Sequence, residues 1–179
     1  MAKKVLIIST SLRKGGNSDT LADSFLQGAT DAGNAVEKIS LYGKTINFCK
    51  GCLACQKIKK CVIADDVKDI IEKMKTADVI VFATPIYYYE MAGQMKTLLD
   101  RTNPLYSSDY AFRDIYLLST AADDGDGIDS RAITGLEGWI ECFPKAHLAG
   151  SVFAGGVTSV GEIKGHPALN KAYEMGKSV

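Results

Sequence analysis

The sequence predicts a doubly wound α/β domain, in which helices cover both faces of a mostly parallel sheet. Residues 5–8 (VLII) and 79–83 (VIVFA) are continuous apolar runs. A run without polar alternation is typical of a strand that is covered on both faces. Segments with the spacing of amphipathic helices separate such runs along the chain. We therefore expect strands and helices to alternate, with about five strands in the sheet.

Apolar stripes predict where the helices lie. The first helix follows Ser18 and ends before Gly33, a residue type that commonly follows a helix end. The second follows Asp65 and Asp66, which are suited to capping it. A last helix begins at about Pro167. The stripes of the first four helices are Leu21, Ala22, Phe25, Leu26 and Ala29; Val67, Ile70, Ile71 and Met74; Met91, Met95, Leu98 and Leu99; and Ile133, Leu136, Ile140 and Phe143.

Three more strands are expected, at residues 35–41, 114–120 and 146–154. A chain of 179 residues is the size of one domain. We therefore expect a single domain over residues 1–179. In a sheet of this kind, ligands bind beyond the carboxyl ends of the strands, where the strand order reverses.

The composition excludes several classes of function. Lysine and arginine together number 21 and aspartate and glutamate 21, so no excess positive charge attracts nucleic acid or an anionic membrane. The apolar run in the N-terminal MAKKVLIIST is too short for a signal peptide or a spanning helix. We expect a cytoplasmic protein. Its five cysteines are then kept reduced, which favours metal-binding or redox roles over disulfides.

The loop after the first strand has the composition of a phosphate-binding site. Residues 9–18 read STSLRKGGNS and lead from a strand into a helix. The glycines let backbone amides turn inward, the helix N-terminus adds partial positive charge, and Arg13 adds a full one. Hydroxyl and amide side chains add donors: Ser9, Thr10, Ser11, Asn17 and Ser18. The loop is neither a Walker loop nor G-x-G-x-x-G, which argues against ATP and a Rossmann-bound dinucleotide. A plain polar turn with a capping serine is the alternative.

This loop resembles the FMN-phosphate loop of the flavodoxin-like NAD(P)H-dependent FMN reductase superfamily, with its Ser-x-Arg-x-x-x-Asn-Ser/Thr pattern. Ser11, Arg13, Asn17 and Ser18 stand at the patterned positions. The resemblance implies a three-layer sandwich with a parallel sheet in the order 2-1-3-4-5. It also implies bound FMN, with NAD(P)H as the co-substrate.

A second loop also resembles this superfamily. Residues 84–101 (TPIYYYEMAGQMKTLLDR) match a flavin loop that reads Ser/Thr-Pro-hydrophobic-Tyr and leads into a helix with a Lys and an Asp-Arg pair. A proline-fixed turn rich in tyrosine can supply both an aromatic wall and backbone donors to a flat ring. By that match the flavin is lined by Pro85, Ile86, Tyr87 and Tyr88. The tyrosines are alternatively subunit contacts, since these reductases are typically dimers.

A third loop, residues 119–127 (STAADDGDG), follows the fourth strand, where the superfamily places backbone contacts to the flavin. Its residues are small enough for a close approach to the ring, and we include Thr120, Ala121 and Ala122 in the site. The acidic run lacks the glutamate at the twelfth position that a calcium loop requires.

Residues 48–61 read FCKGCLACQKIKKC, with cysteines in the spacing C-x2-C-x2-C-x5-C. This spacing departs from zinc patterns and from the bacterial ferredoxin run. It resembles the motif of the iron–sulfur flavoproteins, a branch of the same superfamily, in which these cysteines ligate a [4Fe–4S] cluster. By that resemblance the metal ligands are Cys49, Cys52, Cys55 and Cys61. Two alternatives stay open: a reactive C-x-x-C thiol pair, and four cysteines that pack as small apolar side chains. Cys142, in an apolar stripe, is expected in the core.

The resemblance implies an FMN-dependent oxidoreductase in which a reduced nicotinamide passes hydride to the flavin. A quinone, azo, nitro or flavin compound then takes the electrons. No side chain need act as an acid or base, because the protein holds the flavin and sets its potential. An electron-transfer protein with FMN and a cluster, serving a ferredoxin-type carrier, is the alternative. We expect a homodimer or higher homo-oligomer.

Overall fold

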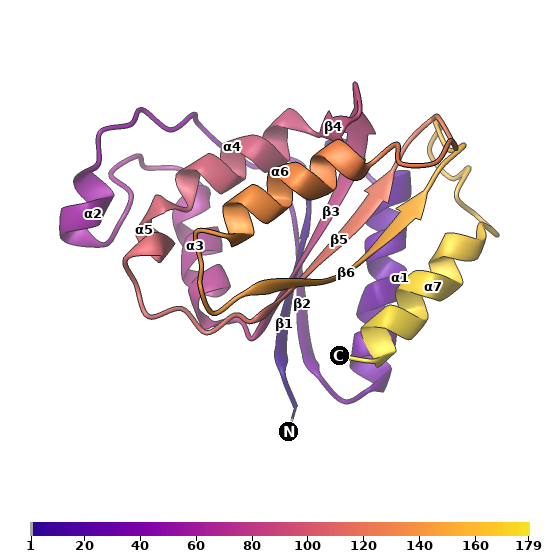
Figure 1. The fold of residues 1–179 in the computed structure, drawn as a ribbon, viewed down its shortest axis with the longest axis horizontal. Coiled ribbons are helices and arrows are strands. Elements are labelled where there is room, and N and C mark those ends of the chain that lie inside the picture. Colours follow the sequence, from indigo (N-terminus) through magenta and orange to yellow (C-terminus); the bar gives the residue numbers. More distant parts are fainter. Residues whose placement is uncertain (1) are drawn as a thin grey trace.

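A computed structural model describes residues 2–179, and it forms the expected α/β sandwich (Figure 1). The parallel strands are β1 (Lys4–Ser9), β2 (Ala35–Ser40), β3 (Val79–Tyr87), β5 (Asp114–Thr120) and β6 (His147–Ala154), in the order β2-β1-β3-β5-β6. This is the predicted order with one addition. The short strand β4 (Glu90–Met91) pairs antiparallel with the end of β3.

Helices cover both faces of the sheet. On one face α1 (Asn17–Asp31) packs beside α7 (Pro167–Lys177), and on the other lie α3 (Val67–Thr76), α4 (Gly93–Arg101) and α6 (Ser130–Ile140). Two short helices were not predicted: α2 (Ala54–Ile58) and α5 (Asn103–Tyr106). No helix among residues 2–179 is long and apolar enough to cross a membrane.

The apolar runs became the central strands because both of their faces are covered. Five of the six residues of β1 and eight of the nine residues of β3 are buried. The core has two parts, one on each side of the sheet. Dry, densely packed layers of this kind hold the strand ends rigidly. The loops at the carboxyl ends therefore start from fixed positions.

Three details differ from the sequence predictions. Met91 belongs to β4 rather than to the helix, which begins at Gly93. Asp66 precedes α3 without a side-chain cap, whereas Asp65 accepts a hydrogen bond from Val67 N at 3.2 Å. The prediction for Cys142 is wrong: this residue is exposed on the turn after α6, whereas the next residue, Phe143, is buried.

Candidate functional site

The three predicted cofactor loops meet at one edge of the sheet, because β1, β3 and β5 are parallel neighbours. Ser9 pairs with Ala83, and Pro85 pairs with Thr120. Thr10 donates to Ala83 O from both its amide, at 2.8 Å, and its hydroxyl, at 3.1 Å. The edge collects every predicted cofactor residue: Ser9, Ser11, Arg13, Asn17, Ser18, Pro85, Ile86, Tyr87, Tyr88, Thr120, Ala121 and Ala122.

The phosphate loop, residues 10–16, has features that fit an anion. Helix α1 begins after Gly16 without a side-chain cap, so its first amides have no partner within the helix. Ser9 is fully buried, and its hydroxyl has no hydrogen-bond partner among the described residues. A Cβ on Gly16 would come within 2.7 Å of Ser11 Oγ. An unpartnered hydroxyl beside the positive end of a helix fits a phosphate group.

A segment that the sequence analysis did not assign closes this loop. Residues 155–166, which we term the closing segment, follow β6 and contact two predicted phosphate ligands. Arg13 donates to Thr158 O at 2.8 Å, and Asn17 donates from Nδ2 to Ser159 O at 3.0 Å. The amide of Ile163 donates to Asn17 Oδ1 at 3.3 Å. The side chain of Asn17 therefore positions the closing segment, whereas Arg13 keeps further guanidinium donors for an anion.

One carboxylate shapes the closing segment. Glu162 accepts hydrogen bonds from the amides of Thr158 at 2.6 Å and Ser159 at 2.9 Å. These two bonds lower the pKa of Glu162. They also orient the two carbonyls that Arg13 and Asn17 contact. The only sequence signal was a run of glycines after the last strand, at the strand end where ligands bind.

The tyrosines of the second loop form the turn between β3 and β4. Tyr88 and Tyr89 both have positive φ, 51° and 67°, as a two-residue hairpin turn requires. That backbone conformation is unfavourable for residues other than glycine, asparagine and aspartate. Tyr88 is 97% exposed, and Pro85 and Ile86 are buried as strand residues. The turn thus presents two rings outward at a cost in backbone strain.

The third loop packs against the closing segment. Ala121 donates to Ala154 O at 3.1 Å and accepts from the amide of Val157 at 2.9 Å. Its amide is therefore engaged within the protein. Thr120 and Ala121 are buried, whereas Ala122 is exposed. Of these three residues, Ala122 has the most accessible backbone.

The four cysteines of residues 48–62, the cysteine loop, line one small cavity of about 20 Å³. Cys49 and Cys52 are exposed, Cys61 is half-buried, and only Cys55 is buried. Burial, and to a smaller extent the neighbouring cysteines 61, 52 and 49, raise the pKa of Cys55. Packing as small apolar side chains therefore explains Cys55 alone.

The donor set of this cavity fits a four-iron cluster better than a single ion. No group of three or more His, Cys, Asp or Glu residues in the described chain is arranged to hold one metal ion. A [4Fe–4S] cluster instead takes four thiolates, one for each iron, so the thiolates surround a volume rather than one point. Four cysteines line one cavity and supply that number of thiolates, but in this structure they are not gathered around a common centre. Because the cavity is small, a cluster would displace its exposed side, to which Cys49 and Cys52 belong.

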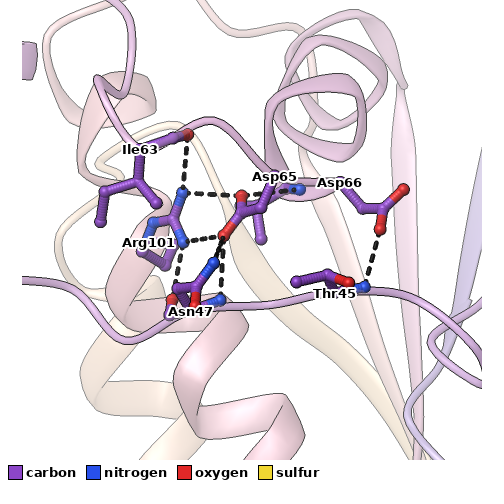
Figure 2. A network of polar contacts seen from close by, with 7 residues as sticks. Thr45, Asn47, Ile63, Asp65, Asp66 and Arg101 are labelled. Atoms are coloured by element: carbon purple, nitrogen blue, oxygen red, sulfur yellow. Dashed lines mark hydrogen bonds and ion pairs between the residues drawn. The ribbon is translucent and has the colours of Figure 1, made fainter.

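A buried ion pair closes the base of the cysteine loop (Figure 2). Arg101, the last residue of α4, contacts Asp65 at 2.7 Å, and the two side chains are 0% and 1% exposed. Burial alone would raise the pKa of Asp65, but hydrogen bonds from Arg101 and Asn47 lower it to about 2. The pKa of Arg101 is raised, first by Asp65 and then, against the effect of burial, by the Cys61 thiol. The sequence shows Arg101 only as part of the Asp-Arg motif. Asp65 accepts from Val67 N, as a residue that caps α3 can, but its pairing with Arg101 was not predicted.

A hollow of about 410 Å³ lies between the cysteine loop and the tyrosine turn, which is formed by Tyr87, Tyr88 and Tyr89. It is lined by Phe48 of the cysteine loop, Tyr87 of the tyrosine turn and residues at the start of α4. Phe48 is 78% exposed. Apolar side chains from both regions therefore face the same surface.

Comparison with known proteins decides the family. The family model described as NADPH-dependent FMN reductase matches residues 3–132, most of the chain. The chain belongs to this family. The matched residues include the phosphate loop, the tyrosine turn, the cysteine loop and the third loop, but not the closing segment.

Relatives within this family carry a more specific name. An iron-sulfur flavoprotein of Methanocaldococcus jannaschii is 42% identical over 102 residues, 57% of this chain and 53% of the relative. The chain thus spans about half the length of that relative. An iron-sulfur flavoprotein of Methanosarcina thermophila is 29% identical over 166 residues, 92% of this chain and 84% of the relative.

A solved structure agrees on the fold. An NAD(P)H:quinone oxidoreductase from Methanothermobacter marburgensis superposes with a TM-score of 0.74, covering 99% of this chain and 98% of that one. At 15% identity the likeness concerns the fold alone. It confirms the flavodoxin-like architecture predicted for this FMN reductase family member.

Proposed function

We propose that this protein is an FMN-dependent NAD(P)H oxidoreductase that passes electrons to a small acceptor such as a quinone, azo, nitro or flavin compound. The observation that carries the proposal is the anion cradle. It combines an uncapped N-terminus of α1 with the buried, unpartnered hydroxyl of Ser9. Membership of the NADPH-dependent FMN reductase family supports FMN as the anion's source and NAD(P)H as the reductant.

The residues of the site would bind and orient FMN. The phosphate would contact the hydroxyls of Ser9, Ser11 and Ser18, the first amides of α1 and the free donors of Arg13. The flavin ring would lie against the tyrosine turn. Pro85 and Ile86 would fix the start of this turn, and Tyr87 and Tyr88 would form the wall beside the ring. Thr120, Ala121 and Ala122 would line the opposite edge. Bound FMN would supply the redox chemistry, and no side chain of the chain needs to transfer a proton.

The domain organisation, the oligomeric state and the location in the cell are also proposals. Residues 1–179 form one domain, and a homodimer would cover the exposed rings of Tyr87, Tyr88 and Tyr89. The balanced charge gives no reason for a nucleic acid partner, and we place the protein in the cytoplasm.

Arg13→Ala tests the FMN site. The expected result is FMN binding at least about tenfold weaker in a fluorescence titration, because a charge-assisted contact to phosphate is lost. Lys14→Ala is the control, because it removes an equally charged, exposed neighbour in the same loop. Equal FMN affinity of both variants and the parent would contradict the phosphate assignment. Reduction of the bound flavin by NADH and NADPH, followed separately, tests the activity.

A second candidate function is electron transfer by FMN together with a [4Fe–4S] cluster, in exchange with a ferredoxin-type carrier. Two observations favour it: the four cysteines line one cavity, and the relatives that are 42% and 29% identical are named iron-sulfur flavoproteins. Cys49, Cys52, Cys55 and Cys61 would hold the cluster.

Anaerobic purification with FMN, iron and sulfide quantified on one sample separates the candidates. FMN without iron or sulfide supports the reductase alone and excludes the cluster. Four irons and four sulfides per chain, the composition of one [4Fe–4S] cluster, support two redox centres. Absence of FMN after incubation with excess FMN contradicts both.

A further inference from the structure

The buried ion pair between Arg101 and Asp65 lies outside the proposed flavin site, and its burial is energetically costly. A buried charge pair is costly unless its geometry is good and its remaining donors are satisfied. Arg101 has no exposed side-chain surface. Its Nε has no hydrogen-bond partner among the described residues. The stability of the core alone therefore does not explain why a buried arginine occupies this position.

Arg101 joins the two ends of the cysteine loop. Its Nη1 donates to Asn47 O at 2.6 Å, just before the loop, and its Nη2 makes a longer contact of 3.5 Å to Ile63 O, just after it (Figure 2). Asp65 accepts from the amide of Asn47 at 2.9 Å and from Arg101 at 2.7 and 3.0 Å. We term residues 45–47 and 63–66, with Arg101, the neck.

The cysteine loop beyond the neck has little structure of its own. It contains only the five-residue helix α2, which is flanked by Leu53 and Lys59 with positive φ of 55° and 58°. Most of its residues are exposed. Figure 1 shows the loop and α2 extending past α4 and α5 at one end of the molecule. The relative positions of its cysteines therefore depend on how the neck holds the two ends and on the packing of α2 against α5.

The neck also adjoins the cavity that the cysteines line. Arg101 and Ile63 line that cavity together with Cys49, Cys52, Cys55 and Cys61. Resting on the cluster of the second candidate function, we propose that Arg101 is the positioning residue that holds the four thiols together for cluster binding and places a positive charge beside the cluster. A lysine could supply the charge but not the planar fork that contacts Asp65 and Asn47 O at once.

Four variants test this proposal on the full-length chain with FMN bound. Arg101→Met removes the fork and the charge, and Arg101→Lys restores only the charge. The double variant Asp65→Leu/Arg101→Met removes the neck without leaving a buried charge, so it is expected to fold even where the single variant does not. Arg113→Met is the control, because Arg113 likewise donates to loop carbonyls, those of Tyr110, Ala111 and Phe112, but lies outside the cysteine cavity.

Three readouts are measured after anaerobic reconstitution with iron and sulfide: iron per chain, the midpoint potential of the cluster, and amide hydrogen exchange of residues 48–63. We expect both Met variants at position 101 to lose most of the iron and to exchange at least about tenfold faster in this segment. Any cluster that remains in Arg101→Met should have a lower midpoint potential, because the lost positive charge favoured the reduced, more negative form. Arg101→Lys should recover the potential but only part of the iron. Arg113→Met should match the parent in all three.

Two results would overturn the proposal, and they are distinguishable. If the parent binds a full cluster and the double variant binds it equally, with the same potential and exchange, Arg101 does not position the thiols. If the parent takes up no iron, the cluster itself is excluded, and the inference falls with it. FMN content, read from the flavin absorbance of the same samples, reports on the flavin proposal separately in both cases.

Discussion

The phosphate loop and the cysteine loop are both irregular segments beyond strand ends, but they are held in opposite ways. The phosphate loop, residues 10–16, is fixed at both ends by the backbone, because Thr10 N bonds to Ala83 O and α1 begins directly after Gly16; the Arg13 side chain adds a contact with the closing segment. The cysteine loop, residues 48–62, is held at its ends by a side-chain ion pair. A binding site made of backbone groups is already formed before its ligand binds. A site held in place by side chains depends on a few residues and on the group that it binds. The comparison predicts different responses to mutation.

Removal of Asp65 should have the largest effect. Asp65→Ala leaves the guanidinium of Arg101 buried and unpaired, so we expect unfolding in urea to require roughly 3–5 kcal/mol less free energy. Asp66→Ala is the matched control: Asp66 accepts one hydrogen bond, from the amide of Thr45 at 2.7 Å, and lies 3.8 Å from Lys44, with 42% of its side chain exposed. That control should lose about 1 kcal/mol. Equal losses in both variants would mean that the Arg101–Asp65 ion pair does not hold this part of the molecule.

This contrast also explains how much of the molecule the sequence could predict. The alternation of strands and helices and the phosphate loop follow from local patterns, because continuous apolar runs and a glycine-rich strand-to-helix turn are contiguous in the chain. The strand order came from the family resemblance. The family match over residues 3–132 agrees with that prediction. The assignment of individual flavin ligands stays a prediction.

The neck could not be predicted, because its energy comes from residues far apart in the sequence. Asp65 and Arg101 are separated by 36 positions, and the local pattern predicts only that Asp65 caps the start of α3. The contact of Arg13 with Thr158, across 145 positions, escaped prediction for the same reason. The prediction for Cys142 failed because apolar neighbours in the sequence do not show which way a residue in a turn faces: Cys142 is exposed and Phe143 is buried.

Acid should weaken the neck. The pKa of Asp65 is about 2 in the folded chain, against 3.8 ordinarily, so its ion pair stabilises the fold above about pH 4 and is lost as the pH falls toward 2. The expected loss is about 2 kcal/mol, since one pKa unit corresponds to about 1.4 kcal/mol. Urea unfolding between pH 5 and about pH 2.5 measures it. The double variant Asp65→Leu/Arg101→Met should lack this part of the acid dependence, and an unchanged dependence would assign it to other carboxylates.

Glu162→Ala should affect the phosphate loop through the closing segment. Loss of the bonds from Thr158 N and Ser159 N frees the carbonyls that Arg13 and Asn17 contact. We expect FMN binding to weaken about threefold to tenfold. Glu162→Gln keeps one acceptor oxygen, so its FMN affinity should fall between that of Glu162→Ala and that of the parent. Unchanged FMN affinity in Glu162→Ala would show that the phosphate loop needs no support from the closing segment.

The smallest effects come from a pair of glycines that make the comparison directly. Gly15 lies in the phosphate loop and Gly51 in the cysteine loop; both have a φ of 63°, and a Cβ on either would meet no atom within 4 Å. Alanine at each position therefore introduces the same backbone strain, about 1 kcal/mol, without a steric clash. In Gly15→Ala the strain acts on amides that are already in place for the phosphate, so FMN should bind about fivefold more weakly. In Gly51→Ala it acts beyond the neck, and FMN affinity and the free energy of unfolding should both stay close to those of the parent, because this part of the loop can adjust without disturbing the core. Parallel FMN titrations and urea unfolding of the two variants measure this difference. Equal effects of the two alanines on FMN binding would mean that the loops are coupled, and that the cysteine loop contributes to the flavin site.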